Sequence, residues 1–289
     1  MVTNWLNRAS RNPSVYAFTV VDMSEKIQID DSIKSYLGEQ TLIQYRSLEW
    51  LKKRYGNESS TVLCEYLRNN VFPSTTNQIT KNVRQGDFGE ILTTLVVEEF
   101  KNLKVPISKL RYKFNKDRSV FCTDLISHNQ GNTITDITYY EVKTRITYSD
   151  DIGVKAYEGL LKDEKKPNES IADFLDRYYF DQAEIYSAAG DVTKANEYYS
   201  IAKQFGDLVK NPTNFNRRFE IIIIMETSKF KEDILTQLNS LSLQLSPLEV
   251  TVVLVDNLSN LVSEVFTKAE KVAESQVLTT SPSPKNIPV

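Results

Sequence analysis

Residues 84–148 constrain the fold more than any other part of the chain. Apolar side chains recur at helical spacing from Phe88 to Leu103, which predicts an amphipathic helix over residues 87–104 with one buried face. Three β-rich runs follow and predict strands at about 109–115, 119–127 and 134–148. A helix that leads directly into consecutive strands indicates an α/β protein.

The rest of the chain extends this pattern. Residues 219–225 and 250–255 are apolar runs that predict strands buried on both faces, and helices are expected over 230–242 and 257–275. Residues 153–210 are expected to be helical, with small and aromatic side chains that favour an inserted helical hairpin. We therefore expect an α/β fold with a mixed central sheet flanked by helices.

The first 80 residues are predicted to be an accessory segment. A β-rich run at 15–21 predicts a strand, and helical spacing follows over 31–55 with a break near Gly38. The polar connector 72–77 marks the boundary. The predicted organisation is an accessory segment over 1–80, a main domain over 81–275 with the insertion at 153–210, and a disordered tail over 276–289.

Composition excludes several kinds of chemistry. The two cysteines, Cys64 and Cys122, lack C-x-x-C spacing, which argues against a disulfide scaffold or a structural zinc site. The single histidine, His128, lies in a polar turn and is expected to be a solvated surface residue. With a formal net charge of −3, any nucleic-acid partner must be met by a local basic patch. The start of the chain has no signal-peptide order and no apolar run is long enough for a bilayer, so we expect a soluble, cytoplasmic protein without a membrane partner.

Acidic side chains fall at specific positions of the predicted helix and strands. Alternation in the third strand places Glu141 and Lys143 on one face. A hairpin would bring Asp124 of the preceding strand beside them. Asp87 is expected to cap the helix, placing Glu90 in its first turn where the helix dipole favours a carboxylate. Converging carboxylates repel each other unless a cation lies between them, and oxygen ligands favour Mg²⁺ or Mn²⁺.

Simpler interpretations stay open for these residues. Glu141 and Lys143 could form a plain salt bridge, and Glu90 could be a favourable first-turn acid. The basic block 101–118, with Tyr112 and Phe114 interleaved, is either a solvated hairpin edge or a flank that contacts phosphates.

The layout of Asp124, Glu141 and Lys143 resembles the PD-(D/E)xK nuclease superfamily, which has the restriction-endonuclease-like fold. The resemblance implies that Asp124 and Glu141 hold Mg²⁺, that Lys143 positions the attacking water, and that Glu90 is an additional metal-binding acid. Thr123 stands where the motif has proline, a position at which the superfamily is tolerant. The resemblance covers about 84–148 by motif and 219–275 by topology.

More narrowly, the helix opening 86–90 and the strand 139–144 resemble the HamA family of the Hachiman anti-phage system. That resemblance implies a bacterial DNA nuclease with a superfamily-two helicase partner, HamB, which restrains or feeds it. The alternative is a catalytically silent nuclease-like subunit that binds DNA or supports assembly.

Overall fold

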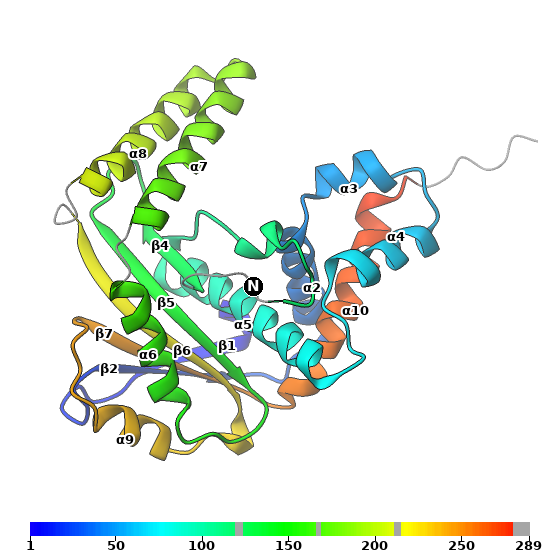
Figure 1. Ribbon diagram of the computed structural model, residues 1–289. Coiled ribbons are helices and arrows are strands. Elements are labelled where there is room, and N and C mark those ends of the chain that lie inside the picture. The colour runs from blue at the N-terminus through cyan, green and yellow to red at the C-terminus, as the bar shows by residue number, and fades with distance from the viewer. Residues whose placement is uncertain (119–123, 166–168, 211–214, 280–289) are drawn as a thin grey trace, which may run out of the picture.

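The computed structural model describes the whole chain except residues 119–123, 166–168, 211–214 and 280–289. In the described part, seven strands form one sheet in the order β1-β2-β7-β6-β5-β4-β3 (Figure 1). The strands are β1 (Leu6–Ser10), β2 (Thr19–Glu25), β3 (Leu103–Lys104), β4 (Leu125–Asn129), β5 (Asp136–Arg145), β6 (Asn216–Glu226) and β7 (Leu248–Val255). The α-helices are α1 (Val2–Trp5), α2 (Asp31–Tyr45), α3 (Leu48–Tyr55), α4 (Ser60–Tyr66), α5 (Gln78–Lys101), α6 (Ile152–Lys165), α7 (Glu169–Ala188), α8 (Val192–Lys210), α9 (Asp233–Asn239) and α10 (Leu258–Val277). Short turns of other helix types are η1 (Leu67–Val71), η2 (Lys109–Tyr112) and η3 (Thr227–Lys229).

The sheet is mixed, as the sequence predicted. β2, β7, β6 and β5 run parallel, whereas β1, β4 and β3 pair antiparallel toward the two edges. The isoleucine run of β6, residues 221–224, is fully buried, which confirms the prediction of a central strand covered on both faces.

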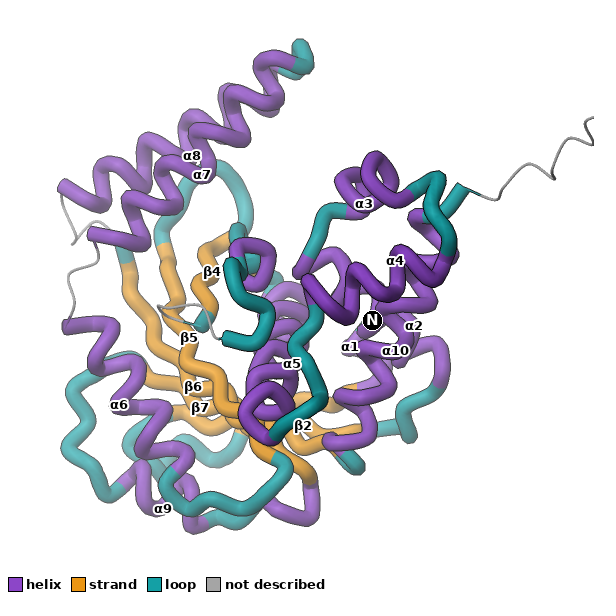
Figure 2. Tube along the Cα trace, turned by 45° about the vertical axis from the view of Figure 1, so that its right-hand side comes forward, coloured by secondary structure: helices purple, strands orange, loops and turns teal. Residues whose placement is uncertain are grey.

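Helices cover both faces of this sheet (Figure 2). Alternate side chains of each strand feed two separate cores, because successive residues of a strand point to opposite faces. One core joins Tyr140 and Val142 of β5 to α5 and α10, while the other joins Tyr139 to α6 and α9. α7 and α8 form the predicted hairpin, whose far end projects from the body (Figure 1).

The N-terminal segment belongs to the central sheet and is not an appendage. β2 pairs with β7 from Thr19 to Ser24, and Trp5 is fully buried in the core that contains α5 and α10. α2 continues through Gly38, where a break was predicted. A Cβ there would lie 2.7 Å from the Lys268 Cβ, so this glycine lets α2 pack closely against α10.

Several predicted boundaries near the site are wrong. α5 begins at Gln78, where the Asn77 side chain accepts a hydrogen bond from the Thr80 N–H at 3.0 Å, so Asp87 is not the cap. The segment predicted as a strand at 109–115 is the turn η2 followed by a loop. β4 starts only at Leu125, and residues 119–123 of its predicted range lie outside the described residues. At the other end of the chain, α10 extends to Val277.

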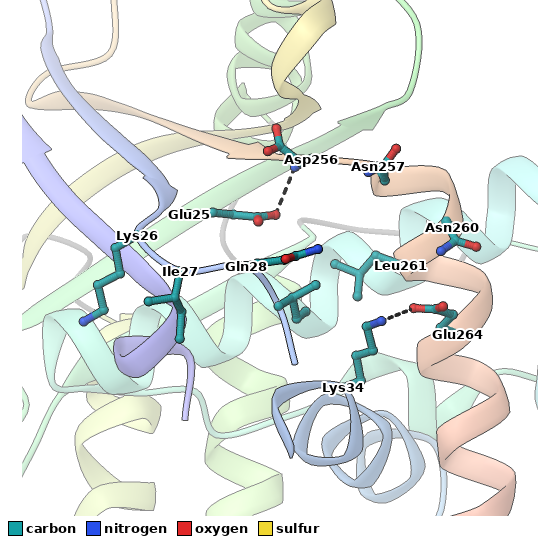
Figure 3. A pocket seen from close by; sticks show the side chains of 11 residues that line it. Glu25, Lys26, Ile27, Gln28, Lys34, Asp256, Asn257, Asn260, Leu261 and Glu264 are labelled. Atoms are coloured by element: carbon teal, nitrogen blue, oxygen red, sulfur yellow. Dashed lines mark hydrogen bonds and ion pairs between the residues drawn. The ribbon is translucent and has the colours of Figure 1, made fainter. Parts of the chain in front are cut away.

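A polar pocket of about 440 Å³ lies where β2 and β7 end (Figure 3). The Asp256 N–H donates to the Glu25 carboxylate at 2.9 Å, and Lys34 pairs with Glu264 at 2.7 Å. These contacts tie the β2–α2 connection to the start of α10. In the part of the chain that the structure describes, no helix is long and apolar enough to cross a membrane.

Candidate active site

β5 carries the first pair of predicted site residues. Glu141 and Lys143 lie on the same side of the strand, as alternation predicted, and the Lys143 ammonium forms an ion pair with the Glu141 carboxylate. That carboxylate lies against α6, since a Cβ added to Gly159 would be 2.7 Å from the Glu141 Cδ. Gly159 therefore makes room for the acid, and the sequence analysis had not singled it out.

Asp124 immediately precedes β4 and contacts two other parts of the site. Its Oδ2 accepts a hydrogen bond from the Val142 backbone N–H at 2.9 Å, between Glu141 and Lys143 in sequence. Its Oδ1 accepts from the Lys109 ammonium at 2.9 Å. The side chain thus occupies the hydrogen-bonding edge of β5 at the point where pairing with β4 stops.

Glu90 lies in the middle of α5 and not in its first turn, so the predicted effect of the helix dipole is wrong. Its Oε1 is 3.3 Å from the Lys109 ammonium. Burial raises the pKa of Glu90 to about 8, against the opposing effect of Lys109, and the nearby Asp124 charge adds to the increase.

Lys109 is the site residue whose role the sequence analysis missed. Its ammonium bridges Asp124 and Glu90 from η2. Burial lowers the pKa of Lys109, but the Glu90 and Asp124 carboxylates outweigh burial and raise it overall. The sequence signal is faint: Lys109 and Lys113 are four residues apart in a basic block, and both turn inward.

The predicted metal ligands are brought together only in part. Asp124 and Glu90 share one cation, the Lys109 ammonium, which shows that this pair suits a positive charge. Glu90 belongs to α5 on one face of the sheet, whereas Glu141 lies against α6 on the other. Among the described residues, no three His, Cys, Asp or Glu side chains are close enough together to hold a metal ion.

The basic block 101–118 is mostly engaged inside the protein. Lys101 pairs with Glu220 at 2.7 Å and Glu249 at 2.5 Å, and Lys113 pairs with Asp87, which also accepts a hydrogen bond from the Tyr45 hydroxyl. These lysines therefore form neither the solvated hairpin edge nor the phosphate-contacting flank that the sequence analysis considered for residues 101–118. Burial raises the pKa of Asp87 even beside Lys113.

His128 is buried in β4, so the prediction of a solvated turn residue is wrong. Its Nδ1 donates to the Asn129 carbonyl at 2.7 Å, which leaves Nε2 to accept from the Tyr179 hydroxyl at 2.6 Å. Burial lowers the pKa of His128 to about 4. The residue thus serves to join β4 to α7.

Together these features define a mixed α/β protein with a charged cluster of acids and lysines where α5, β4 and β5 meet. The HamA family model matches residues 1–269, and the chain belongs to the HamA family, a component of Hachiman anti-phage defence. No curated protein matches the chain.

Proposed function

We propose that this protein is a metal-dependent DNA nuclease with a restriction-endonuclease-like core that acts in Hachiman anti-phage defence. The observation that carries the proposal is the position of Asp124. Its carboxylate is hydrogen-bonded to the Val142 N–H beside Glu141 and Lys143, and it reaches Glu90 through the Lys109 ammonium. This supports the proposal, because Asp124 contacts both the backbone between Glu141 and Lys143 and the ammonium that it shares with Glu90, although the Glu141 carboxylate itself lies on the other face of the sheet.

The metal, Mg²⁺ or Mn²⁺, would be held by Asp124 and Glu141 with Glu90 as the additional acid. When bound, such an ion polarises the phosphate and activates water for hydrolysis. Lys143 would then contribute its positive charge near the phosphate, and its ion pair with Glu141 keeps it close to the site. Because the described geometry does not gather all three acids, Glu141 and Lys109 must shift when the ion binds.

The proposed partners are DNA and a superfamily-two helicase of the HamB type. A nuclease without sequence preference would damage its own host, so restraint by the helicase fits the defence role. The alternative is a catalytically silent subunit that binds DNA. The internal Lys143–Glu141 and Lys109–Asp124 pairs are what a silent fold would also contain.

Plasmid cleavage tests the proposal. The purified protein and its helicase complex are incubated with supercoiled plasmid, Mg²⁺ or Mn²⁺ and ATP, and parallel reactions contain EDTA. We expect cleavage that requires the metal and falls at least a hundredfold in Glu141→Gln, Lys143→Met and Asp124→Asn. Circular dichroism establishes that each variant is folded.

Matched controls come from α6. Glu158 is exposed on that helix and Lys155 is 59% exposed, so Glu158→Gln and Lys155→Met should cleave like the natural protein. Cleavage that survives in all three site variants would refute the assignment of the site. DNA binding without cleavage in either preparation would support the silent subunit.

A further inference from the structure

The last residue of η2 and the residues after it display aromatic side chains beside the charged cluster. Phe114 is the most exposed large hydrophobic side chain in the described part of the chain, with a relative exposure of 107%, and Tyr112 is 50% exposed. Because the Phe114 ring is exposed to water, it contributes no hydrophobic free energy to the stability of this fold. We refer to Tyr112 and Phe114 as the aromatic platform.

The inward lysines fix the direction of the platform. Lys113 is 3% exposed at its side chain and pairs with Asp87 of α5, while Lys109 pairs with Asp124 and Glu90. The backbone of Lys113 is extended, with φ −64° and ψ 120°. Because side chains alternate in an extended chain, Phe114 points away from the buried Lys113, and Tyr112, the last residue of η2, is also exposed. The ion pairs of Lys109 and Lys113 therefore hold the segment in place, and the Tyr112 and Phe114 rings face outward beside the candidate site.

The platform adjoins the candidate site through α7. The Tyr112 ring meets the Phe174 ring edge to face, with centroids 6.3 Å apart at 81°. Phe174 also lines a small cavity of about 80 Å³ together with Lys109 and Asp124. A molecule on the platform would thus extend toward the Asp124 carboxylate.

Two arginines beside the platform carry charge that favours a phosphate backbone. Arg111 donates to the Ile43 carbonyl and Arg46 donates to the Tyr45 carbonyl at 2.7 Å, so neither charge is neutralised by the bond it makes. A pocket of about 380 Å³ beside Tyr112 is lined by Asp176, Asp181 and Arg177, and Arg177 pairs with Asp173 at 2.8 Å. Phosphates would be attracted by Arg111 and Arg46.

We infer that Tyr112 and Phe114 stack on unpaired bases of DNA that enters the Asp124 and Glu141 site. The inference rests on the proposed function and names its substrate class: single-stranded or locally melted DNA. Stacking on an aromatic side chain requires an open base face, which a paired duplex interior does not offer. Each such contact contributes about 1–3 kcal/mol.

Binding without cleavage tests this inference. The full-length chain carrying Glu141→Gln is titrated in EDTA with three fluorescein-labelled DNAs: an oligothymidine strand, a blunt duplex, and an abasic strand with the same number of phosphates. Fluorescence anisotropy reports the Kd of each. We expect Phe114→Ala to weaken binding of the oligothymidine strand about tenfold, equivalent to about 1.4 kcal/mol, and Tyr112→Ala to weaken it by a similar factor. Binding of the duplex and of the abasic strand should change less than twofold.

Two further variants serve as controls. Phe114→Trp keeps an aromatic face and should bind the oligothymidine strand like its parent. Ile185→Ala removes another exposed apolar side chain, 59% exposed on α7, and should have no effect. Equal losses for the oligothymidine and abasic strands would show that the two rings do not contact the bases and would overturn the inference.

Other outcomes separate this inference from the proposed function. If the parent binds no oligothymidine, or if both alanine variants bind it like the parent, stacking is refuted even when plasmid cleavage is observed. If binding depends on Phe114 but no preparation cleaves DNA, the platform is supported and the nuclease proposal fails.

Discussion

Lys109 sets the electrostatic state of the candidate site. Two carboxylates in a half-buried position repel each other, and one ammonium within 3.3 Å of both relieves that repulsion. Such a pair is weak evidence of net stabilisation, because desolvation offsets the attraction. Removal of only the cation is costly, since it leaves two largely buried acids without the positive charge that they share.

Lys109→Met should therefore be destabilising in a metal-dependent way. In EDTA we expect a loss of about 3 kcal/mol of unfolding free energy, because Glu90 and Asp124 lose their shared cation. Millimolar Mg²⁺ should recover part of this loss in the variant and should stabilise the natural protein less. Denaturant melts in EDTA and in Mg²⁺ measure both effects. A variant equally unstable with and without Mg²⁺ would show that the two acids do not take up a divalent ion.

His128 makes stability depend on pH. Burial holds its pKa near 4 in the folded chain, below the ordinary value of about 6.5, so folding favours the neutral ring. The contribution of the neutral ring is complete above pH 6.5 and is lost as the pH falls toward 4. At 1.36 kcal/mol per pKa unit, the loss is about 3 kcal/mol.

The comparison variant is His128→Gln, which can keep a donor and an acceptor but has no proton to gain. Between pH 7 and pH 4 the natural protein should lose about 3 kcal/mol more than this variant in urea melts. As this is the single histidine of the chain, its NMR titration also reports the pKa directly. A midpoint near 6.5 would contradict the buried, neutral assignment.

At the scale of elements, the contact between α5 and β5 organises the site. Gly89 makes it possible: a Cβ at this position would lie 1.8 Å from the Thr144 Oγ1 and 3.1 Å from the Thr144 Cβ. This close packing of α5 on β5 therefore fixes the distance of the next residue, Glu90, from the sheet. Gly86 is one turn earlier, and a Cβ there would meet nothing within 4 Å.

Alanine at the two glycines should give opposite results. Gly89→Ala forces α5 away from β5 and should cost about 2 kcal/mol of unfolding free energy. Gly86→Ala adds helix propensity in open space and should gain about 0.5–1 kcal/mol. Urea denaturation of both variants measures the difference. Two losses of equal size would mean that only the flexibility of the helix matters at these positions.

Periodicity explains which elements the sequence could predict. Apolar residues recur at helical spacing in α5, and side chains alternate between the two faces of β5. Both elements could therefore be predicted, and so could the position of Glu141 and Lys143 on the same side of β5. The turn η2 could not be predicted, because Lys109 within it and Lys113 just after it are held inward by ion pairs with Asp124 and Asp87, which lie in other parts of the chain. For the same reason the role of Lys109 was missed. His128 was likewise expected to be exposed, but it is buried.

At the scale of the whole molecule, one hydrophobic core joins the two ends of the described chain. Val2 and Trp5 share a cluster with Ala273 and Val277 of α10, and β2 completes the sheet beside β7. This pairing could not be predicted, because local patterns at 1–80 carry no information on which distant strand they join. The polar stretch at 72–77 looked like a linker between domains but connects parts of one core.

Because the N-terminal segment shares its core with α5 and α10, we expect one cooperative unfolding transition, and the two tryptophans test it from within that segment. Trp5 is fully buried, so Trp5→Ala should lower the midpoint of the entire transition by the equivalent of about 3–5 kcal/mol. Trp50 is 40% exposed on α3, so Trp50→Ala should cost about 1 kcal/mol or less. Circular dichroism, which reports on all helices and strands, follows both variants. If Trp5→Ala instead splits unfolding into an early minor step and an unshifted major one, residues 1–80 form an independent unit, because loss of a side chain from a shared core must weaken every element packed on it.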